Sequence, residues 1–200
     1  YGNPLVRIVA AIVLTGATLP LLAAAMAITG NVASSVLHLS QGTAALQPVV
    51  SATPFNGHTV VQFDSAAKQW LATSAAVKLG TAFVVARCTN YTAPNKFANY
   101  GGLLTGTGAG GAAHVYLAAD AGKATWYTFA SPPTVNIFCD GVDTDTAGIP
   151  AWHAYHVTDS NPTAYGTDFR VGVNRSYTDH TWGGDVAEII VCDSVLSAAN

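Results

Sequence analysis

The chain has 200 residues, of which 50% are hydrophobic and only 10% are charged, and its formal net charge is -3 at pH 7. Soluble globular proteins carry about 25% charged residues, so we expect a largely neutral surface that packs against neighbouring molecules. The eight Lys and Arg residues are spread along the chain and offer no basic patch for a phosphate backbone. We therefore expect no nucleic-acid partner, and the length suits a single all-β domain.

The N-terminal stretch is unusual because residues 8–63 contain no Asp, Glu, Lys or Arg, and residues 8–28 are almost wholly apolar. Three interpretations are open. Arg7 followed by an apolar run that ends in the small residues 25–27 is typical of a secretory signal. A membrane span also needs about 20 apolar residues. The third interpretation is a retained arm that is buried in its own domain or in an adjacent subunit.

We favour the arm, because Gly16 and Pro20 interrupt the apolar run and a positive flank is nearly absent. The β-branched residues of the run also favour an extended strand. The sequence therefore predicts an apolar N-terminal arm at residues 1–30 and one folded domain at residues 31–200. We do not expect the membrane to be a partner.

From residue 32 onward, short runs of β-branched and aromatic residues are separated by turn signals, which is typical of an antiparallel sandwich. The predicted strands, in chain order, are His58–Phe63, Thr81–Ala86, Val135–Cys139, Phe169–Val173 and Val186–Val191. The run at 81–86 is continuously apolar, so we expect a central strand covered on both faces. Asn56-Gly57 and Asp140-Gly141 predict tight hairpin turns.

Two further patterns predict ordinary structure. The glycine-rich segment at 101–111 lacks the Lys-Ser/Thr end of a phosphate loop, so we expect a flexible loop there. Cys88, Cys139 and Cys192 are widely spaced and show no metal-ligand pattern, which predicts small core residues. One disulfide is open in an oxidising compartment, where the odd count leaves one thiol unpaired within the chain.

The C-terminal third carries a resemblance to a known family. Phe169-x-Val171-Gly172, a variable loop, and then Gly184-Asp185-Val-Ala-Glu188-Ile-Ile-Val resemble the closing strands of concanavalin A-like (lectin/glucanase, laminin G-like) domains of phage and bacterial surface proteins. Weaker matches extend the similarity to residues 30–197. The resemblance implies an antiparallel two-sheet β-sandwich, or jelly roll. The chain departs from the family at Cys192, where an aromatic residue is usual, and in lacking the usual opening Trp.

The motif residues Gly184, Asp185 and Glu188 are expected to be structural. On a regular strand Glu188 would share a face with Val186 and Ile190 and would be the one polar residue among them. A carboxylate in that position needs partners. We expect Asp185 and Glu188 to accept backbone or Arg hydrogen bonds that tie the last strand to its neighbour.

No catalytic set is recognisable. Glucanases of this fold resemble one another in a Glu-x-Asp-x-x-Glu strand whose carboxylates act as nucleophile and acid, but Glu188 is the only Glu in the chain. A nucleophile elbow is absent as well. His153 and His156 lie three apart on a predicted strand and so face opposite sides, which argues against a metal pair. We expect a protein that is not an enzyme.

Two groups of residues remain as binding candidates. Asp140, Asp143 and Asp145 form the densest acidic cluster and are secondary candidates for calcium, although their order does not match an EF-hand loop. Otherwise no cofactor is expected. Trp182 is the best candidate for an exposed platform on which a sugar ring stacks. The neighbouring His180 and Tyr177 complete this candidate glycan contact.

The resemblance and the uncharged arm together favour a virion structural protein, either a capsid decoration or cement subunit or a tail or fibre component. Such a protein would form a homo-oligomer or lattice and would join other subunits through its arm. The alternative is a secreted or cell-surface glycan-binding lectin-like module. A glycoside hydrolase is the third hypothesis, and fold alone does not choose among the three.

Overall fold

The computed structural model describes residues 39–73, 77–92, 94–107, 114–129, 135–144, 146, 149–161, 168–174 and 177–196. The arm predicted at residues 1–30 and the candidate ligand Asp145 lie outside the described residues. Within the described part of the chain, no helix is long and apolar enough to cross a membrane.

The fold is all-β, as the sequence predicts, and the one helical element described is the 3-10 turn η1 (Ala44–Leu46). The strands are β1 (Val49–Val50), β2 (Val61–Phe63), β3 (Leu71–Ala72), β4 (Thr81–Cys88), β5 (Tyr91–Thr92), β6 (Lys96–Phe97), β7 (Gly102–Thr107), β8 (His114–Ala119), β9 (Trp126–Phe129), β10 (Val135–Cys139), β11 (Val142–Asp143), β12 (His153–Asp159), β13 (Asp168–Val171), β14 (Val173–Asn174), β15 (Tyr177–Thr181) and β16 (Gly184–Cys192).

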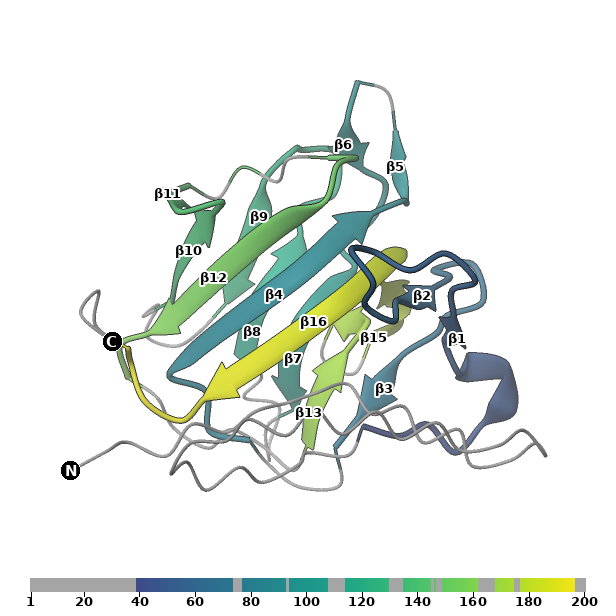
Figure 1. The fold of residues 1–200 in the computed structure, drawn as a ribbon, viewed down its shortest axis with the longest axis horizontal. Coiled ribbons are helices and arrows are strands. Elements are labelled where there is room, and N and C mark those ends of the chain that lie inside the picture. The colour runs from purple at the N-terminus through teal and green to yellow at the C-terminus, as the bar shows by residue number, and fades with distance from the viewer. Residues whose placement is uncertain are drawn as a thin grey trace.

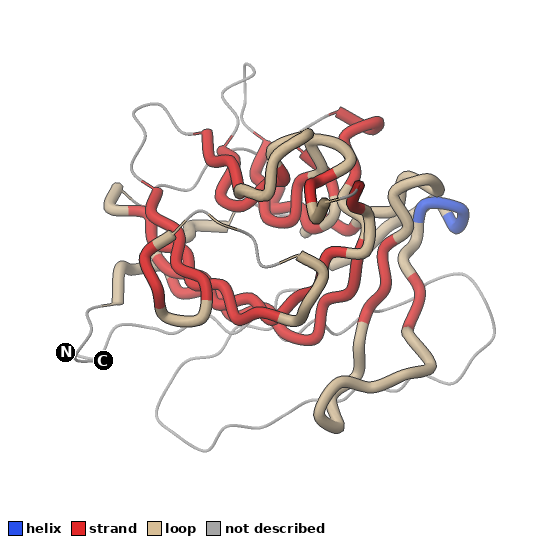
Figure 2. The backbone as a smooth tube through the Cα atoms, turned by 90° about the horizontal axis from the view of Figure 1, so that it is seen from above, coloured by secondary structure: helices blue, strands red, loops and turns tan. Residues whose placement is uncertain are grey.

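The strands form two layers, which Figure 1 shows face-on and Figure 2 shows from above. The front sheet has the order β1-β2-β16-β4-β12-β10-β11. The back sheet has the order β14-β15-β7-β13-β3, and β8 and β9 extend it from β7. The pairings are antiparallel except for the short parallel contact of β15 with β7. The hairpin of β5 and β6 projects beyond the sandwich (Figure 1).

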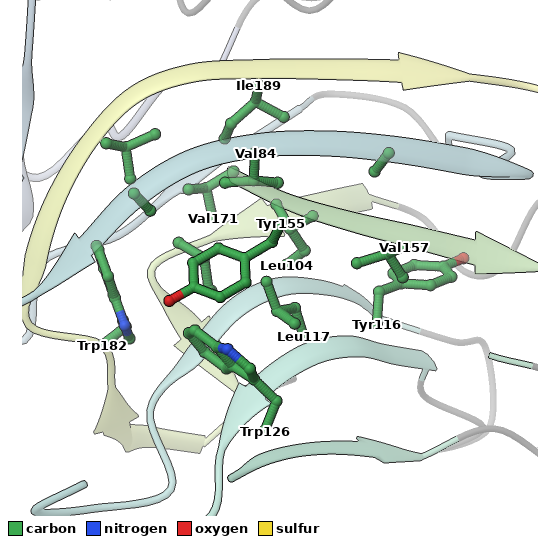
Figure 3. Packing of buried hydrophobic residues seen from close by; sticks show 14 of the residues in the cluster. Val84, Leu104, Tyr116, Leu117, Trp126, Tyr155, Val157, Val171, Trp182 and Ile189 are labelled. Carbon is green, nitrogen blue, oxygen red and sulfur yellow. The ribbon is translucent and has the colours of Figure 1, made fainter. Parts of the chain in front are cut away.

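The core fills the space between the two sheets, because each strand sends alternate side chains inward. In β4 these are Ala82, Val84, Ala86 and Cys88, all at most 4% exposed. They meet large side chains of the back sheet and of β12, among which Figure 3 shows Leu104, Tyr116, Leu117, Trp126, Tyr155 and Val157. Burying this contiguous apolar cluster is the main stabilising contribution to the sandwich.

Both predicted hairpin turns are confirmed. Asn56 and Gly57 have φ angles of 48° and 79°, and Phe55 pairs with His58 across them. Asp140 and Gly141 have φ angles of 50° and 83° between β10 and β11. Two successive residues with positive φ make a type I′ turn, whose twist matches that of paired strands and which Asn-Gly and Asp-Gly favour.

Two expectations need correction. The strand predicted at 58–63 is shorter, since β2 spans only Val61–Phe63. The glycine-rich segment is not a loop where it is described, because Gly102–Thr107 forms the strand β7 in the back sheet. Glycine suits this strand for a packing reason: a Cβ on Gly102 would lie 2.6 Å from the backbone Cα of Asn174. A local composition rule misses this contact because the two residues are far apart in sequence.

Candidate functional surface

The outer face of the front sheet carries an apolar row that crosses four adjacent strands. Ile190 of β16 pairs with Phe83 of β4, Phe83 pairs with His156 of β12, and His156 pairs with Phe138 of β10. The ring of His156 stacks on Phe83 with a centroid distance of 4.7 Å and on Phe138 with one of 5.1 Å. We call these four residues, the three stacked rings and Ile190, the aromatic row.

The aromatic row corrects the expectation that the strand at 81–86 is covered on both faces. Phe83 is 38% exposed, whereas its neighbours Ala82 and Val84 are almost fully buried. The run is continuously apolar because its inward residues enter the core and its outward residues form an apolar surface. A sequence pattern cannot separate these two environments when both favour apolar side chains.

His156 lies in the middle of the row, and this position affects its ionisation. Burial lowers the pKa of the His156 imidazole. Its Nε2 atom is buried and makes no hydrogen bond within the described residues. A proton on this ring would therefore be poorly solvated, and the neutral form is favoured.

This environment predicts that stability falls with acidification. A histidine whose pKa is lower in the folded than in the unfolded state leaves the unfolded chain to take up the proton first as pH falls through about 6.5. We expect His156→Phe, which continues the stack, to be less sensitive to pH than the parent chain. Thermal melts at about pH 7.5 and about pH 5.5 measure this difference. Equal losses of melting temperature in both proteins would contradict the role of His156.

A charged cluster borders the row on the same sheet. Arg87 of β4 lies directly opposite Asp185 of β16, and both Nε and Nη2 of its guanidinium donate to Asp185 Oδ2, the Nε bond at 3.0 Å. The Asp185 side chain is only 2% exposed. The guanidinium also lies 5.2 Å from the ring centre of Trp152, which stacks on Phe55 at 4.2 Å. Asp185 thus ties the last strand to its neighbour through an ion pair under an aromatic cover.

The strand β16 contains a bulge that changes the expected pattern of faces. Val186 pairs with Ala86 and Glu188 pairs with Val85, so Ala187 is an extra residue. The inward residues are consequently Val186, Ile189 and Val191, each at most 2% exposed. The expectation that Val186 shares a face with Glu188 is therefore wrong, because a bulge shifts the phase of the alternation by one residue.

Glu188 is half-buried on the outer face beside the aromatic row, and its carboxylate makes no hydrogen bond or ion pair with the described residues. We expect Glu188→Gln to change the free energy of unfolding by less than about 0.5 kcal/mol, because partly solvated side chains without partners contribute little. Urea unfolding measures this. A loss above about 1 kcal/mol would show that the carboxylate has a structural partner.

Trp182 is not the exposed aromatic platform that the sequence suggests. It is 1% exposed and lies in the core (Figure 3), where its ring meets the edge of Phe63 at a centroid distance of 6.0 Å. The close packing here also accounts for the glycine in the motif, because a Cβ on Gly184 would lie 2.3 Å from the carbonyl oxygen of Arg87 and 2.6 Å from Cη2 of Trp182. His180 is partly exposed and 5.9 Å from the ring of Tyr100, while the Tyr177 side chain lies outside the described residues.

The β10–β11 hairpin contains Asp140, one of the acidic candidates. Its Oδ2 lies 2.5 Å from Nδ1 of His153, and its Oδ1 accepts a hydrogen bond of 2.9 Å from the backbone N–H of Ala154. The bond to His153 and then that to Ala154 lower the pKa of the Asp140 carboxyl group. Among the described residues, the cluster of metal-ligating side chains at Asp140 contains Cys139 and His153 but not Asp143.

Sequence reasoning missed this cluster, because it assigns Cys139 to the core and treats His153 only in relation to His156. The structure places both histidines as that reasoning predicts, with only His156 on the outer face. All three cysteines are buried, and none of them forms a disulfide. Burial raises the pKa of the Cys88 thiol to about 12, so this residue is an inert core thiol.

Comparison of the chain with protein-family models, with curated proteins and with solved structures found no match.

Proposed function

We propose that this chain is a concanavalin A-like β-sandwich and a non-enzymatic structural subunit of a virus particle, as a capsid decoration or cement protein or as a tail or fibre component. Its front sheet packs against a second copy of the chain. The resemblance of the closing strands supports the family and the particle. The presence of a single Glu in the whole chain supports the absence of a carboxylate-pair hydrolase.

The observation that carries the packing role is the placement of exposed apolar residues. Phe83 and Val49, which are 38% and 50% exposed, lie on the outer face of the front sheet, whereas the exposed Val50 and Val142 pair with the inward residues Val61 and Cys139 at the two edges. Among the described residues, none of the large exposed apolar side chains belongs to a strand of the back sheet. An apolar face of this kind marks an interaction surface.

A second copy is the occupant that suits this surface. The apolar part of this face, which lies beside Glu188 and the paired Arg87 and Asp185, is complementary to another sheet face, and two such faces pack about 10 Å apart with interdigitated side chains. Only 10% of the residues are charged, so repulsion between copies is weak. The uncharged sequence of residues 8–63 favours the same conclusion, since such a chain suits a packed assembly better than a free monomer.

The aromatic row is less suited to glycan binding, which is the second hypothesis. Sugar rings bind to the exposed faces of aromatic rings. Here Phe83, His156 and Phe138 stack on one another at interplanar angles of 10° and 22°, so the ring faces are used within the row. A protein surface can instead pack against the apolar edges of these rings, which the stacking does not cover.

The experiment is sedimentation equilibrium of the full chain and of Phe83→Lys. We expect the parent chain to self-associate and the variant to have a dissociation constant at least about tenfold higher, because a desolvated unpaired charge opposes association. Tyr91→Lys is the matched control, since Tyr91 is 42% exposed but lies on the projecting hairpin. It should associate like the parent chain.

A parent chain that remains monomeric at high concentration would contradict packing between copies. A glycan array on the same protein then separates the alternatives. Binding to a defined sugar that Phe83→Lys abolishes would favour the lectin-like module instead.

A further inference from the structure

The hairpin of β10 and β11 and the start of β12 bring three different metal-ligating atoms together. They are Sγ of Cys139, a carboxylate oxygen of Asp140 and a ring nitrogen of His153, all within 4.8 Å of one another. Cys139 pairs with Tyr155 across the two strands, which places His153 level with the turn. The register of a tight hairpin therefore positions the three donor atoms, which do not belong to long side chains on a mobile surface.

We propose that Cys139, Asp140 and His153 form a binding site for a zinc-like divalent cation. Zinc is bound in proteins by thiolate sulfur, imidazole nitrogen and carboxylate oxygen at about 2.0 to 2.3 Å. Calcium and magnesium prefer oxygen ligands alone. A set of one sulfur, one nitrogen and one oxygen thus selects zinc and similar transition metals. Of the secondary candidates for calcium, only Asp140 belongs to this set, and its partners favour a different ion.

The surroundings of the three residues suit an ion with an open position. Cys139 is 8% exposed and the His153 side chain is 18% exposed, so both are held by the packed end of the sandwich. The Asp140 side chain is 54% exposed and faces solvent. Cys139 and His153 on the inner side, with Asp140 and a water on the solvent side, would complete a tetrahedral coordination.

Part of the site is already oriented. The backbone N–H of Ala154 holds Oδ1 of Asp140, which leaves Oδ2 directed at Nδ1 of His153 at 2.5 Å. A hydrogen-bonded carboxylate of this kind fixes the orientation of a metal ligand. The ion would take the place of the proton between Asp140 and His153 and would displace the thiol proton of Cys139. The nitrogen-to-oxygen distance then widens to about 3.3 Å, which the exposed Asp140 accommodates by rotation.

The test uses Co²⁺ as a spectroscopic substitute for zinc on the full chain, kept reduced and freed of metal by a chelator. We expect one Co²⁺ per chain and a thiolate-to-cobalt charge-transfer absorption that zinc abolishes by displacement. Cys139→Ser should lose the charge-transfer absorption, and both Cys139→Ser and His153→Gln should weaken Co²⁺ binding at least about tenfold. Circular dichroism checks that each variant is folded.

The chain offers matched controls for both variants. Cys192→Ser removes another buried thiol, and His156→Gln removes the histidine three residues further along β12. Both should bind Co²⁺ with the parent spectrum and affinity. The proposal is overturned if the folded parent chain takes up no Co²⁺, if the absorption persists in Cys139→Ser, or if calcium displaces the cobalt. If Cys139→Ser does not fold, His153→Gln alone decides, because unchanged affinity in that variant excludes the site. The site does not depend on the proposed packing of the front sheet.

Discussion

Replacing Arg87 by Met is expected to lower the free energy of unfolding by about 2 kcal/mol, because the buried carboxylate of Asp185 loses its cation, although the Arg87 side chain itself is 41% exposed. The carboxylate of Asp185 is 2% exposed, and both of its hydrogen bonds come from Arg87 to Oδ2. Its Oδ1 has no partner among the described residues. Met keeps the length of the apolar stem over Trp152, so the measured loss of stability is due mainly to the missing charge. Urea unfolding at neutral pH is the measurement.

Lys123→Met is the control for this loss. The Lys123 side chain is 66% exposed, and its ammonium group pairs with Asp120 at 2.8 Å. A solvent-exposed pair contributes about 0 to 1 kcal/mol, so this variant should unfold nearly like the parent chain. Adding Asp185→Asn to Arg87→Met should restore part of the lost stability by removing the buried charge. If Arg87→Met costs no more than Lys123→Met, Asp185 is stable without its cation and the ion pair does not hold β16.

Trp182→Ala is expected to cost about 3 to 5 kcal/mol, the range for removing a large aromatic side chain from a core. This is a large fraction of the roughly 5 to 15 kcal/mol by which domains are stable. The ring is 1% exposed and packs against Phe63, and the backbone N–H of Trp182 donates to the carbonyl of Gly172 at 2.9 Å. Trp182→Phe should lose less stability than Trp182→Ala, because Phe keeps most of the apolar volume.

Trp152→Ala is the control for Trp182→Ala, because it also removes an indole side chain but not one from the core. Trp152 is only partly buried and lies on the outer face against Phe55 and Arg87. We expect this variant to cost no more than about 2 kcal/mol. A Trp182→Ala protein that keeps the parent stability but loses binding to a sugar would return Trp182 to the glycan-binding hypothesis.

The sequence predicts those parts of the fold that depend on neighbouring residues. The turns at Asn56-Gly57 and Asp140-Gly141 form because two adjacent residues must adopt positive φ. The strands at β4, β10 and β16 follow from local apolar runs, which need a sheet to bury them. The motif glycine, Gly184, is likewise recognisable, although the reason for it, its close approach to the carbonyl of Arg87 and the ring of Trp182, emerges only from the packed structure.

The features that the sequence does not predict depend on contacts between distant residues or on the phase in which side chains alternate between the two faces of a strand. The extra residue Ala187 reverses the faces of β16, and nothing in the local alternation signals it. Trp182 is expected to be exposed, but it is 1% exposed and lies in the core, where the missing Cβ of Gly184 leaves room for its ring. Cys139 and His153 meet only through the pairing of β10 with β12. No spacing rule for metal ligands covers that separation.

The edges of the front sheet restrict how copies of the chain add to one another. Its two outermost strands, β1 and β11, have two residues each, and each ends the hydrogen-bonded order of the described strands. An edge this short offers few free N–H and C=O groups to an incoming strand, and short edge strands are a means by which proteins avoid edge-to-edge pairing. Elongation of the sheet into a fibril is therefore disfavoured at both ends. In the proposed assembly, repeated copies would stack through their faces, so that surface fit and not continuous backbone pairing would limit the length of an array.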